Sequence, residues 1–317
     1  ECYMTTLIKE QPYRNDMGDF ISLKKKLPYV SVKAQVYIEK LKREIEQSNC
    51  NVIVAFGTIA LWALTEERSI TKWRGSVLDC TLVPGKKVIG CIHPGSAMRN
   101  YLYRHYITHD MKRVLDESKY PDIREPARNY IIAPSMADTM IYLERCLEAD
   151  MVAFDIEVSN MEMSCISFAV DSTSVISIPF IEGGREYFTI TQEMEVMLKI
   201  TEVLENPDII KLGQNVIFDT TFLFRKYGIR TRPCHDTMIG QAILLPEFPK
   251  GLDFITSIYT KERYYKDEGK HRIKTGRGSD RTFWLYNAKD SIVLMEAFPS
   301  IYKELEKQNN LDTYTRQ

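Results

Sequence analysis

Four acidic residues and one tyrosine, spread over 136 positions, are the most informative feature of this sequence. They are Asp155 and Glu157 in MVAFDIE, Asp219 in GQNVIFD, and Tyr286 with Asp290 in LYNAKD. Hard divalent cations such as Mg²⁺ and Mn²⁺ bind carboxylate oxygens, and two such ions can stabilise both the attacking and the leaving oxygen of a phosphodiester. If the carboxylates converge, the sequence predicts metal-dependent hydrolysis of a nucleic acid.

The first two carboxylates follow a short apolar run, residues 151–154, which is typical of a buried strand. Side chains two positions apart on a strand share a face, so Asp155 and Glu157 are expected to point the same way. Taken alone, an Asp-x-Glu pair is common by chance and is usually a solvated strand end.

The other three residues are expected on two helices. One helix is expected to begin at Asn215, a good N-cap residue, which places Asp219 in the first turn. The other is expected at about 282–298, where Tyr286 and Asp290 are four residues apart and share a face. A lone Tyr-x-x-x-Asp pair is more often packing plus surface charge, but three elements in this order favour a functional site.

Together, the segments FDIE, NxxFD and YxxxD resemble the three motifs of the DEDDy 3′→5′ exonucleases. The chain is similar to the proofreading domain of family A DNA polymerases over about 129–317. The segment CHDTMIGQAILLPEFPKGLDFITSIYTKERYYKDEGK looks especially like phage-type polymerases of that family. The resemblance implies a ribonuclease-H-like fold and removal of nucleotides from DNA 3′ ends.

The resemblance also implies a role for each motif residue. Asp155 would bridge two divalent cations, Mg²⁺ or Mn²⁺. Glu157 and Asp290 would complete one of the two metal sites, and Asp219 would act on the other through water. Tyr286 would orient the attacking water together with Glu157.

Substrate contacts are expected around the same motifs. Many family members carry Thr directly after the Glu of the first motif, whereas this chain has Val158, which affects one contact near the terminal nucleotide and not the metal site. The polar segment between 259 and 283 is basic, and its two adjacent tyrosines are expected to stack on bases, although a mobile surface loop would have the same composition. The expected substrate contacts of this half are Asn215, Phe218, Tyr264 and Tyr265.

Length and composition bound the class of protein. With 317 residues, 44% of them apolar and 27% charged, two ordinary globular domains are expected. The sequence has no run of 18 apolar residues and no visible signal peptide, so an intracellular, cytoplasmic protein without a membrane partner is expected, in the bacterial host if it is phage-encoded. The seven cysteines lack any C-x-x-C spacing, which disfavours a disulfide scaffold or a zinc site.

A boundary is expected near 120–128 (YPDIREPAR), which divides the chain into domains 1–128 and 129–317. The first holds 21 Lys+Arg and 15 Asp+Glu, a net +6, and the second holds 21 and 28, a net −7. A basic half could hold a phosphate backbone while metals offset the acidic half, although chance surface variation would give the same difference.

The first domain is expected to be α/β with a mostly parallel sheet, and the second α+β. In the first, the expected elements are a helix at 39–47, strands at 51–56 and 87–93, and a basic helix at 96–115. In the second, they include strands at 130–133, 164–170 and 174–181 and a helix at 136–147.

A second resemblance concerns the first domain. VIVAFGTIALWAL, WRG at 73–75 and CIHPGSAMR at 91–99 resemble the C-terminal half of family 4 uracil-DNA glycosylases, which some phage family A polymerases carry before the exonuclease. His93 would lie beside the uracil carbonyl, although a lone His at a strand end is more often structural. The water-activating motif and four cysteines at iron–sulfur spacing have no counterpart, so an incomplete or inactive domain without an iron–sulfur cluster is expected. The candidate phosphate contacts are Arg74, Arg99 and Arg104.

Three functions are compatible with these observations. The favoured one is a proofreading-type exonuclease acting on single-stranded DNA 3′ ends, with a polymerase domain in cis or trans. The second is a non-catalytic DNA-binding scaffold of a polymerase, which the retention of every motif carboxylate disfavours. The third is a free-standing RNA-trimming exonuclease, which the polymerase-like segment 233–269 disfavours.

Overall fold

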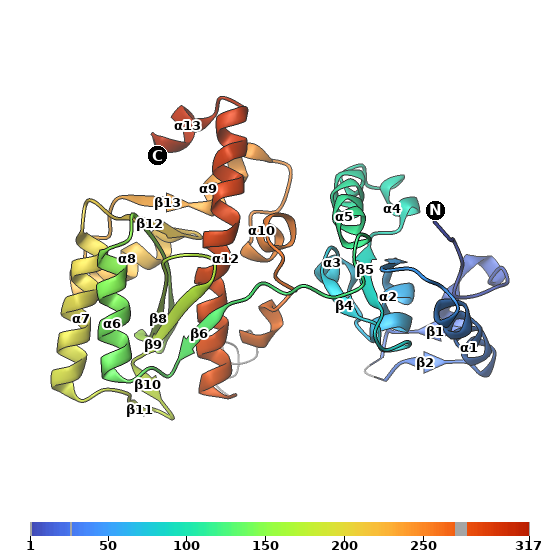
Figure 1. Cartoon of the computed structure of the whole chain (residues 1–317), viewed down its shortest axis with the longest axis horizontal. Helices are drawn as coiled ribbons and strands as arrows, with labels where there is room; N and C mark the ends of the chain where they lie inside the picture. Colours follow the sequence, from blue (N-terminus) through green and yellow to red (C-terminus); the bar gives the residue numbers. More distant parts are fainter. Residues whose placement is uncertain (1, 26, 270–277, 317) are drawn as a thin grey trace. The chain divides into compact units, whose positions relative to one another are not determined.

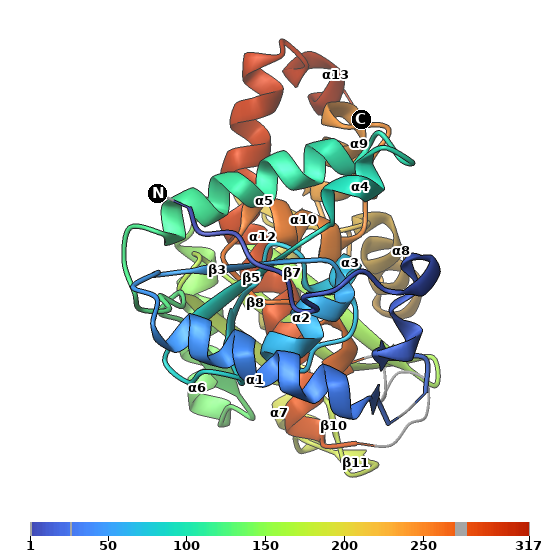
Figure 2. The ribbon, with the colours of Figure 1, turned by 90° about the vertical axis from the view of Figure 1, so that its right-hand side faces the viewer.

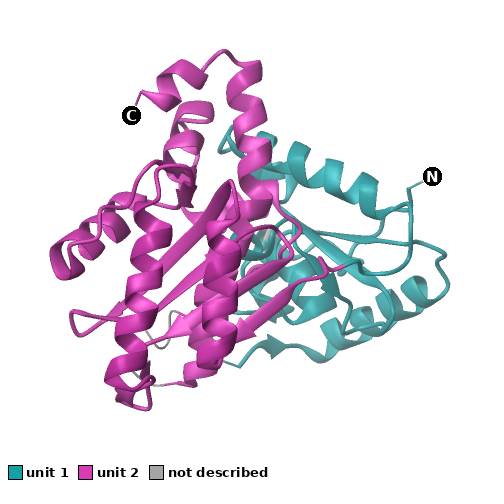
Figure 3. Cartoon of the chain, turned by 60° about the vertical axis from the view of Figure 1, so that its left-hand side comes forward, with its two compact units in different colours: residues 1–124 teal, residues 125–317 magenta. Residues whose placement is uncertain are grey.

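The structure, a computed structural model, describes residues 2–25, 27–269 and 278–316. The chain divides into two units, residues 1–124 and 125–317 (Figures 1 and 3). This division falls four residues before the predicted boundary, so Arg128 belongs to the second unit. Residues 270–277, part of the predicted substrate-binding segment, lie outside the described residues.

A six-stranded mixed sheet forms the centre of the second unit, in the order β13-β12-β7-β8-β9-β6. Strands β7, β8 and β9 form an antiparallel meander, while β12 is parallel to β7 and β13, and β6 is parallel to β9. The mixed sheet is consistent with the predicted ribonuclease-H-like fold. The strands are β6 (Asn129–Ile132), β7 (Met151–Ser159), β8 (Glu162–Ala169), β9 (Ser174–Pro179), β12 (Ile210–Gly213) and β13 (Cys234–Asp236), beside a small hairpin of β10 (Ile181–Glu182) and β11 (Arg185–Glu186).

Helices cover both faces of this sheet, and the alternation of side chains along β7 decides which residues meet which helices. Val152, Phe154 and Ile156 point into a core shared with α6 (Met136–Leu147), α7 (Ile190–Glu205) and α8 (Val216–Tyr227). Ala153 and Ala169 point into the opposite core, shared with α12 (Asp280–Lys307), and their small side chains let this helix lie close to the strands. Further helices are α9 (Thr237–Leu244) and α10 (Leu252–Tyr259), which pack in this second core, and α13 (Leu311–Thr315).

Helix α12 is longer than the predicted 282–298, because it continues through Pro299 to Lys307. A proline inside a helix removes one backbone hydrogen bond. The flanking turns are nevertheless held by packing, since Phe298 and Ile301 are buried in the second core. Gly240 of α9 permits this contact, because a Cβ at that position would lie 2.8 Å from a side-chain carbon of Ile301.

The first unit contains a three-stranded sheet in the order β3-β5-β4, with β3 (Ile53–Phe56), β4 (Val77–Asp79) and β5 (Lys87–Cys91). Strands β3 and β5 are parallel, but β4 is antiparallel to β5, so the prediction of a mostly parallel sheet is wrong for β4. Figure 2 shows α1 (Val32–Glu46) and α5 (Tyr103–Glu117) on opposite sides of these strands.

The predicted basic helix at 96–115 is two helices, α4 (Pro94–Ala97) and α5. A turn separates them, in which the side chain of Asn100 accepts a hydrogen bond of 3.1 Å from the backbone N–H of Leu102. The other elements of this unit are short: 3₁₀ turns Tyr13–Asn15 and Met17–Asp19, a hairpin of β1 (Ile21–Ser22) and β2 (Tyr29–Val30), α2 (Thr58–Thr65) and α3 (Ile70–Trp73). Across the described parts of the chain, no helix combines the length and apolarity needed to span a membrane.

Candidate active site

Three of the predicted carboxylates come together where α12 crosses the sheet. Asp155 and Glu157 follow Ala153 at every second position of β7, so they share the sheet face that α12 covers. Asp290 lies on α12 itself. One oxygen from each of the three residues lies within 4.8 Å of the others, although the residues are far apart in the sequence.

The fourth carboxylate, Asp219, joins the site from the first turn of α8. It is buried, and its Oδ1 accepts a hydrogen bond of 3.0 Å from the backbone N–H of Ile156, the residue between the two acids of β7. Burial raises the pKa of Asp219 to about 7, and the backbone hydrogen bond opposes this shift. The bond therefore fixes the start of α8 against the acidic part of β7.

The start of α8 is capped differently from the prediction. Asn215 is the N-cap residue, but its backbone is left-handed, with φ of 57°, and its side chain makes no capping hydrogen bond. Instead, the backbone N–H groups of Asn215 and Val216 donate to the carboxylate of Asp236, at 3.0 and 2.9 Å. The position of this helix terminus is thus set by a residue from the neighbouring strand β13.

The electrostatics of the cluster favour a bound cation. Burial, followed by the nearby charges of Asp290 and Asp219, raises the pKa of Asp155 well above its ordinary range. Burial and the charge of Asp290 likewise raise the pKa of Glu157 to about 8. The donors are all carboxylate oxygens, and three of them lie within 4.8 Å of one another, so a single cation can contact all three. Both the donor set and its excess of carboxylates over positive charges fit a hard divalent cation.

Tyr286 is buried beside these carboxylates, one turn before Asp290 on α12. Burial and the charge of Asp290 raise the pKa of Tyr286, so its phenol stays protonated at any ordinary pH. Its hydroxyl can therefore donate and accept hydrogen bonds, but it does not act as a base.

Asn287 is a site residue that the sequence prediction missed. Its side-chain amide donates to the carboxylate of Asp155 at 2.9 Å and to the backbone carbonyl of the same residue at 3.1 Å. Its amide oxygen accepts a hydrogen bond of 2.9 Å from the hydroxyl of Ser177. The only sequence signal was a polar residue directly after Tyr286, on a helix expected to face the core.

The two adjacent tyrosines are not the exposed stacking surface that the sequence predicted. Tyr265 is only 2% exposed, and its hydroxyl donates to Asp290 at 2.6 Å. Tyr264 is half-buried, and its hydroxyl donates to Asp267 at 3.1 Å. The prediction treated this segment as an open loop, whereas residues 261–269 pack on α12 and include a helical turn at 266–269.

Lys266 also reaches the site and was missed. Its ammonium donates to both carboxylate oxygens of Asp290, each at 2.6 Å. Among many charged residues of a polar segment, nothing in the sequence distinguished this lysine.

Residues 131–308, more than half of the chain, match the sequence profile of the 3′–5′ exonucleases. The chain belongs to the 3′–5′ exonuclease family. Exonucleases of this DEDD superfamily use divalent metal ions, and Asp155, Glu157 and Asp290 form the matching acidic cluster here. The matched region begins at residue 131, so the glycosylase-like interpretation of residues 1–128 and the assignment to a phage polymerase stay predictions.

Several solved structures resemble part of this chain. The catalytic core of RRP6 from Trypanosoma brucei matches with a TM-score of 0.50 and 14% identity, over 61% of this chain and 52% of that one. Two further matches have TM-scores of 0.46: Escherichia coli RNase D (16% identity; 59% of this chain, 48% of that one) and the Aedes aegypti Nibbler EXO domain (14%; 61% and 100%). A comparison with curated proteins gave no match.

Two other predicted substrate contacts of the exonuclease unit are exposed to solvent, unlike the two tyrosines. Phe218, directly before Asp219, is 53% exposed, and Asn215 is exposed as well. Val158, where many family members carry Thr, is partly buried and packs against the first core. The exposed pair is therefore available to a substrate, while Val158 supplies no hydroxyl group.

In the first unit, Arg74 is not the free phosphate contact that the sequence predicted. It is 2% exposed, and its guanidinium pairs with the buried carboxylate of Asp110, with Nε 3.0 Å from Oδ2. The ring of Tyr106 lies 4.9 Å from the same guanidinium. Arg74 is therefore a core residue of this unit.

The other predicted residues of the first unit lie at its surface. His93 is exposed, and its Nδ1 accepts a hydrogen bond of 3.1 Å from the backbone N–H of Gly95. It thus caps the short helix α4, as the structural interpretation of a lone histidine expects. Arg99 and Arg104 are exposed.

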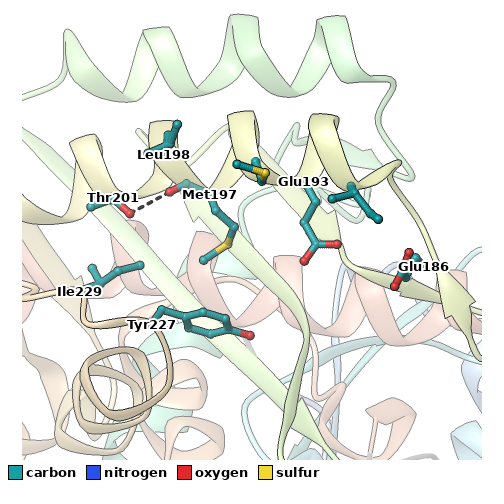
Figure 4. Close-up of a pocket in the computed structure, with 9 residues that line it drawn as sticks. Glu186, Glu193, Met197, Leu198, Thr201, Tyr227 and Ile229 are labelled. Atoms are coloured by element: carbon teal, nitrogen blue, oxygen red, sulfur yellow. Dashed lines mark hydrogen bonds between the residues drawn. The ribbon is translucent and has the colours of Figure 1, made fainter.

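A separate hollow of the exonuclease unit lies along α7 (Figure 4). Its walls are largely apolar: Met197 of α7 faces Tyr227 and Ile229, and Met194 and Leu198 of the same helix also line it. None of the four predicted metal-binding carboxylates lines it. The chemistry predicted for this chain therefore belongs to the acidic cluster and not to this hollow.

Proposed function

We propose that this chain is a metal-dependent exonuclease that removes nucleotides one at a time from the 3′ ends of single-stranded nucleic acid. The convergence of Asp155, Glu157 and Asp290 within 4.8 Å, on the sheet face covered by α12, carries the proposal. Hydrolysis of a phosphodiester requires concentrated positive charge and an oriented water molecule, and this cluster can organise both.

Two divalent cations, Mg²⁺ or Mn²⁺, would be held by the four carboxylates. Asp155 would be shared, Glu157 and Asp290 would complete one site, and Asp219 would serve the other through water. When bound, such ions lower the pKa of water and neutralise charge on the phosphate.

The residues of the chain itself would supply orientation. Glu157 would help to orient the attacking water. Tyr286 stays protonated, so its hydroxyl can hold that water by a hydrogen bond. Asn287 fixes the direction of the Asp155 carboxylate. The exposed ring of Phe218, next to Asp219, can stack on a terminal base.

DNA is the proposed substrate, because the motifs and the segment around 233–269 resemble family A DNA polymerases. A polymerase domain, in cis or trans, is the proposed partner. RNA 3′ ends are the second candidate, since E. coli RNase D, which shares this type of fold, is described as an exoribonuclease involved in structured RNA processing. Discrimination rests on contacts to the 2′-hydroxyl.

The test uses 5′-labelled single-stranded DNA and RNA of the same sequence, with Mn²⁺, Mg²⁺ or EDTA. We expect a ladder of products shortened from the 3′ end, absent in EDTA and absent for Asp155→Ala. Asp208→Ala is the matched control, because Asp208 is an exposed aspartate outside the cluster. Binding without cleavage under every condition would instead identify a non-catalytic scaffold, and the preferred polymer distinguishes the two substrates.

For the first unit, we propose a role in DNA binding or in packing against a polymerase, without base excision. The support is its net charge and the capping role of His93. Incubation with uracil-containing DNA is expected to release no uracil. Free uracil from the wild-type protein that disappears in His93→Ala would contradict this proposal.

A further inference from the structure

We propose that the ammonium of Lys266 holds Asp290 and Tyr286 in place in the metal-free exonuclease site. A metal ion that binds Asp290 would then displace this ammonium from the carboxylate. The inference rests on the proposed function, because it concerns the same carboxylates. It assigns Lys266 a positioning role that precedes metal binding.

The contacts of the ammonium support this role. An ammonium has three N–H donors, and Lys266 directs two to the oxygens of Asp290, at 2.6 Å each, and one to the hydroxyl of Tyr286, at 3.3 Å. The rings of Tyr286 and Tyr265 lie 4.9 and 5.3 Å from the same nitrogen. Lys266 is only 8% exposed, so this charge is enclosed by the site rather than solvated.

The start of the segment that carries Lys266 is anchored to α12. The backbone N–H of Lys261 donates to Glu296 at 2.7 Å. Arg128 pairs with Glu262 at 2.6 Å and also pairs with Glu296. The first residues of the segment are thus tied to the helix by a buried arginine.

The other end of the segment is anchored one turn from the site. Glu268 pairs with Lys289 of α12 at 3.0 Å. Gly269 lies against the ring of Tyr286, where a Cβ would be 2.5 Å from a ring carbon. With both ends held, the segment presents Lys266 to Asp290 in a defined direction.

This arrangement makes the ammonium and a metal ion competitors. Asp290 Oδ1 already accepts hydrogen bonds from Tyr265 and Lys266, and Oδ2 accepts a second bond from Lys266. A cation that takes either oxygen as a ligand must displace an N–H of Lys266 and meets its positive charge at short range. A purely structural ion pair, by contrast, would stay in place whether or not metal is bound.

The experiment compares the whole chain with Lys266→Met and Lys266→Gln, both of which remove the charge. Lys199→Met is the matched control, because it removes the charge of a partly buried lysine that pairs with Glu144 and Glu202 and takes no part in the acidic cluster or its segment. Thermal midpoints are measured in EDTA and in Mn²⁺, and Mn²⁺ affinity is measured by calorimetry.

In EDTA, both Lys266 variants are expected to melt about 5 °C or more below the wild type, because a buried carboxylate loses its partner. Saturating Mn²⁺ should remove most of that difference, and Mn²⁺ should bind about tenfold more tightly to the variants, since the competing charge is gone. The control should bind Mn²⁺ with wild-type affinity.

An equal loss of thermal midpoint with and without Mn²⁺, together with unchanged affinity, would overturn the proposal and leave Lys266 a structural residue. The same conclusion follows if neither variant folds even in Mn²⁺, or if Lys199→Met reproduces the effect. Failure of the proposed function looks different, because the wild type itself would then show neither cleavage nor a Mn²⁺-induced shift.

Discussion

The side chain of Asn287 donates to both the carboxylate and the backbone carbonyl of Asp155, at 2.9 and 3.1 Å. Because the same amide accepts a hydrogen bond from Ser177, one residue ties α12 to two strands of the sheet. The helix that carries Tyr286 and Asp290 is thereby locked in register with the strand that carries Asp155. Convergence of the carboxylates thus depends on a neutral side chain as well as on the acids.

Asn287→Ala should therefore impair catalysis without removing any charge. We expect the cleavage rate to fall about 10- to 100-fold, as is typical when a partner that orients a metal ligand is lost. The unpaired Ser177 hydroxyl should lower the free energy of unfolding by about 1–3 kcal/mol. The control is Ser291→Ala, since Ser291 bonds to Ser167 at 2.7 Å instead of to an acid, and it should lose stability but keep its rate. Equal rates for the two variants would contradict a positioning role.

Asp155→Ala should abolish nearly all nuclease activity in Mg²⁺ or Mn²⁺ and leave the fold intact. Without metal, the clustered carboxylates repel one another, so removal of one should raise the thermal midpoint in EDTA. Cleavage assays and thermal melts of the same preparation check both parts. Wild-type cleavage by this variant in Mg²⁺ would show that the metal site lies elsewhere.

Tyr286→Phe isolates the hydroxyl, because the ring and its contact with Gly269 are retained. If that hydroxyl positions the attacking water, the rate should fall roughly 10- to 1,000-fold, with metal affinity little changed. Single-turnover cleavage at saturating Mn²⁺ separates these two effects. An unchanged rate would leave Tyr286 a packing residue.

The sequence predicted the parts of this site that depend on local periodicity. Strand β7 follows from an apolar run, and the two-residue period then places Asp155 and Glu157 on one face. The helix at 136–147 was likewise predicted with the bounds of α6, and in the structure Ser135 and Asp138 form a capping box at its start. These signals lie within a few residues of the feature they determine.

The missed residues depend on contacts between distant segments. Lys266 reaches Asp290 across 24 positions, and composition alone cannot distinguish it from other lysines of a polar segment. Arg74 was misassigned for the same reason. Its partner Asp110 lies 36 positions away, and this pairing allows the arginine to be buried in the core. Hydrophobic patterns indicate which face is buried, but they do not show which charges are paired there.

Deletion of residues 1–124 tests the first unit and leaves Arg128, which pairs with Glu262, in the exonuclease unit. The deleted part holds 20 Lys+Arg and 14 Asp+Glu, a net +6. If it binds DNA through phosphates, its removal should weaken binding more at low salt than at high salt, because salt screens such contacts. Titration of labelled single-stranded DNA at two salt concentrations measures this. A loss independent of salt would indicate stacking or packing instead.

The metal-free site should make stability depend on pH. Burial, the largest cause in each case, raises the pKa of Glu157 to about 8 and that of Asp219 to about 7. In the unfolded chain both carboxyls have pKa values near the ordinary value of about 4. Between that pH and the raised pKa values, the folded protein therefore keeps protons that the unfolded chain has released. Their contribution to the free energy of unfolding is thus highest at low pH, where both carboxyls are protonated, and it falls as pH rises towards 8.

In EDTA, the thermal midpoint should therefore fall between pH 6 and pH 8, whereas in Mn²⁺ the fall should be smaller, because the cation replaces the protons. Mn²⁺ affinity should rise over the same range, since the ligands must lose their protons to bind. Asp219→Asn is the matched variant, because it removes one titrating group and retains an oxygen that can accept the N–H of Ile156. Its EDTA profile should be flatter than that of the wild type. A wild-type midpoint in EDTA that rises from pH 6 to pH 8 would show that these carboxyls are ionised in the folded protein without metal.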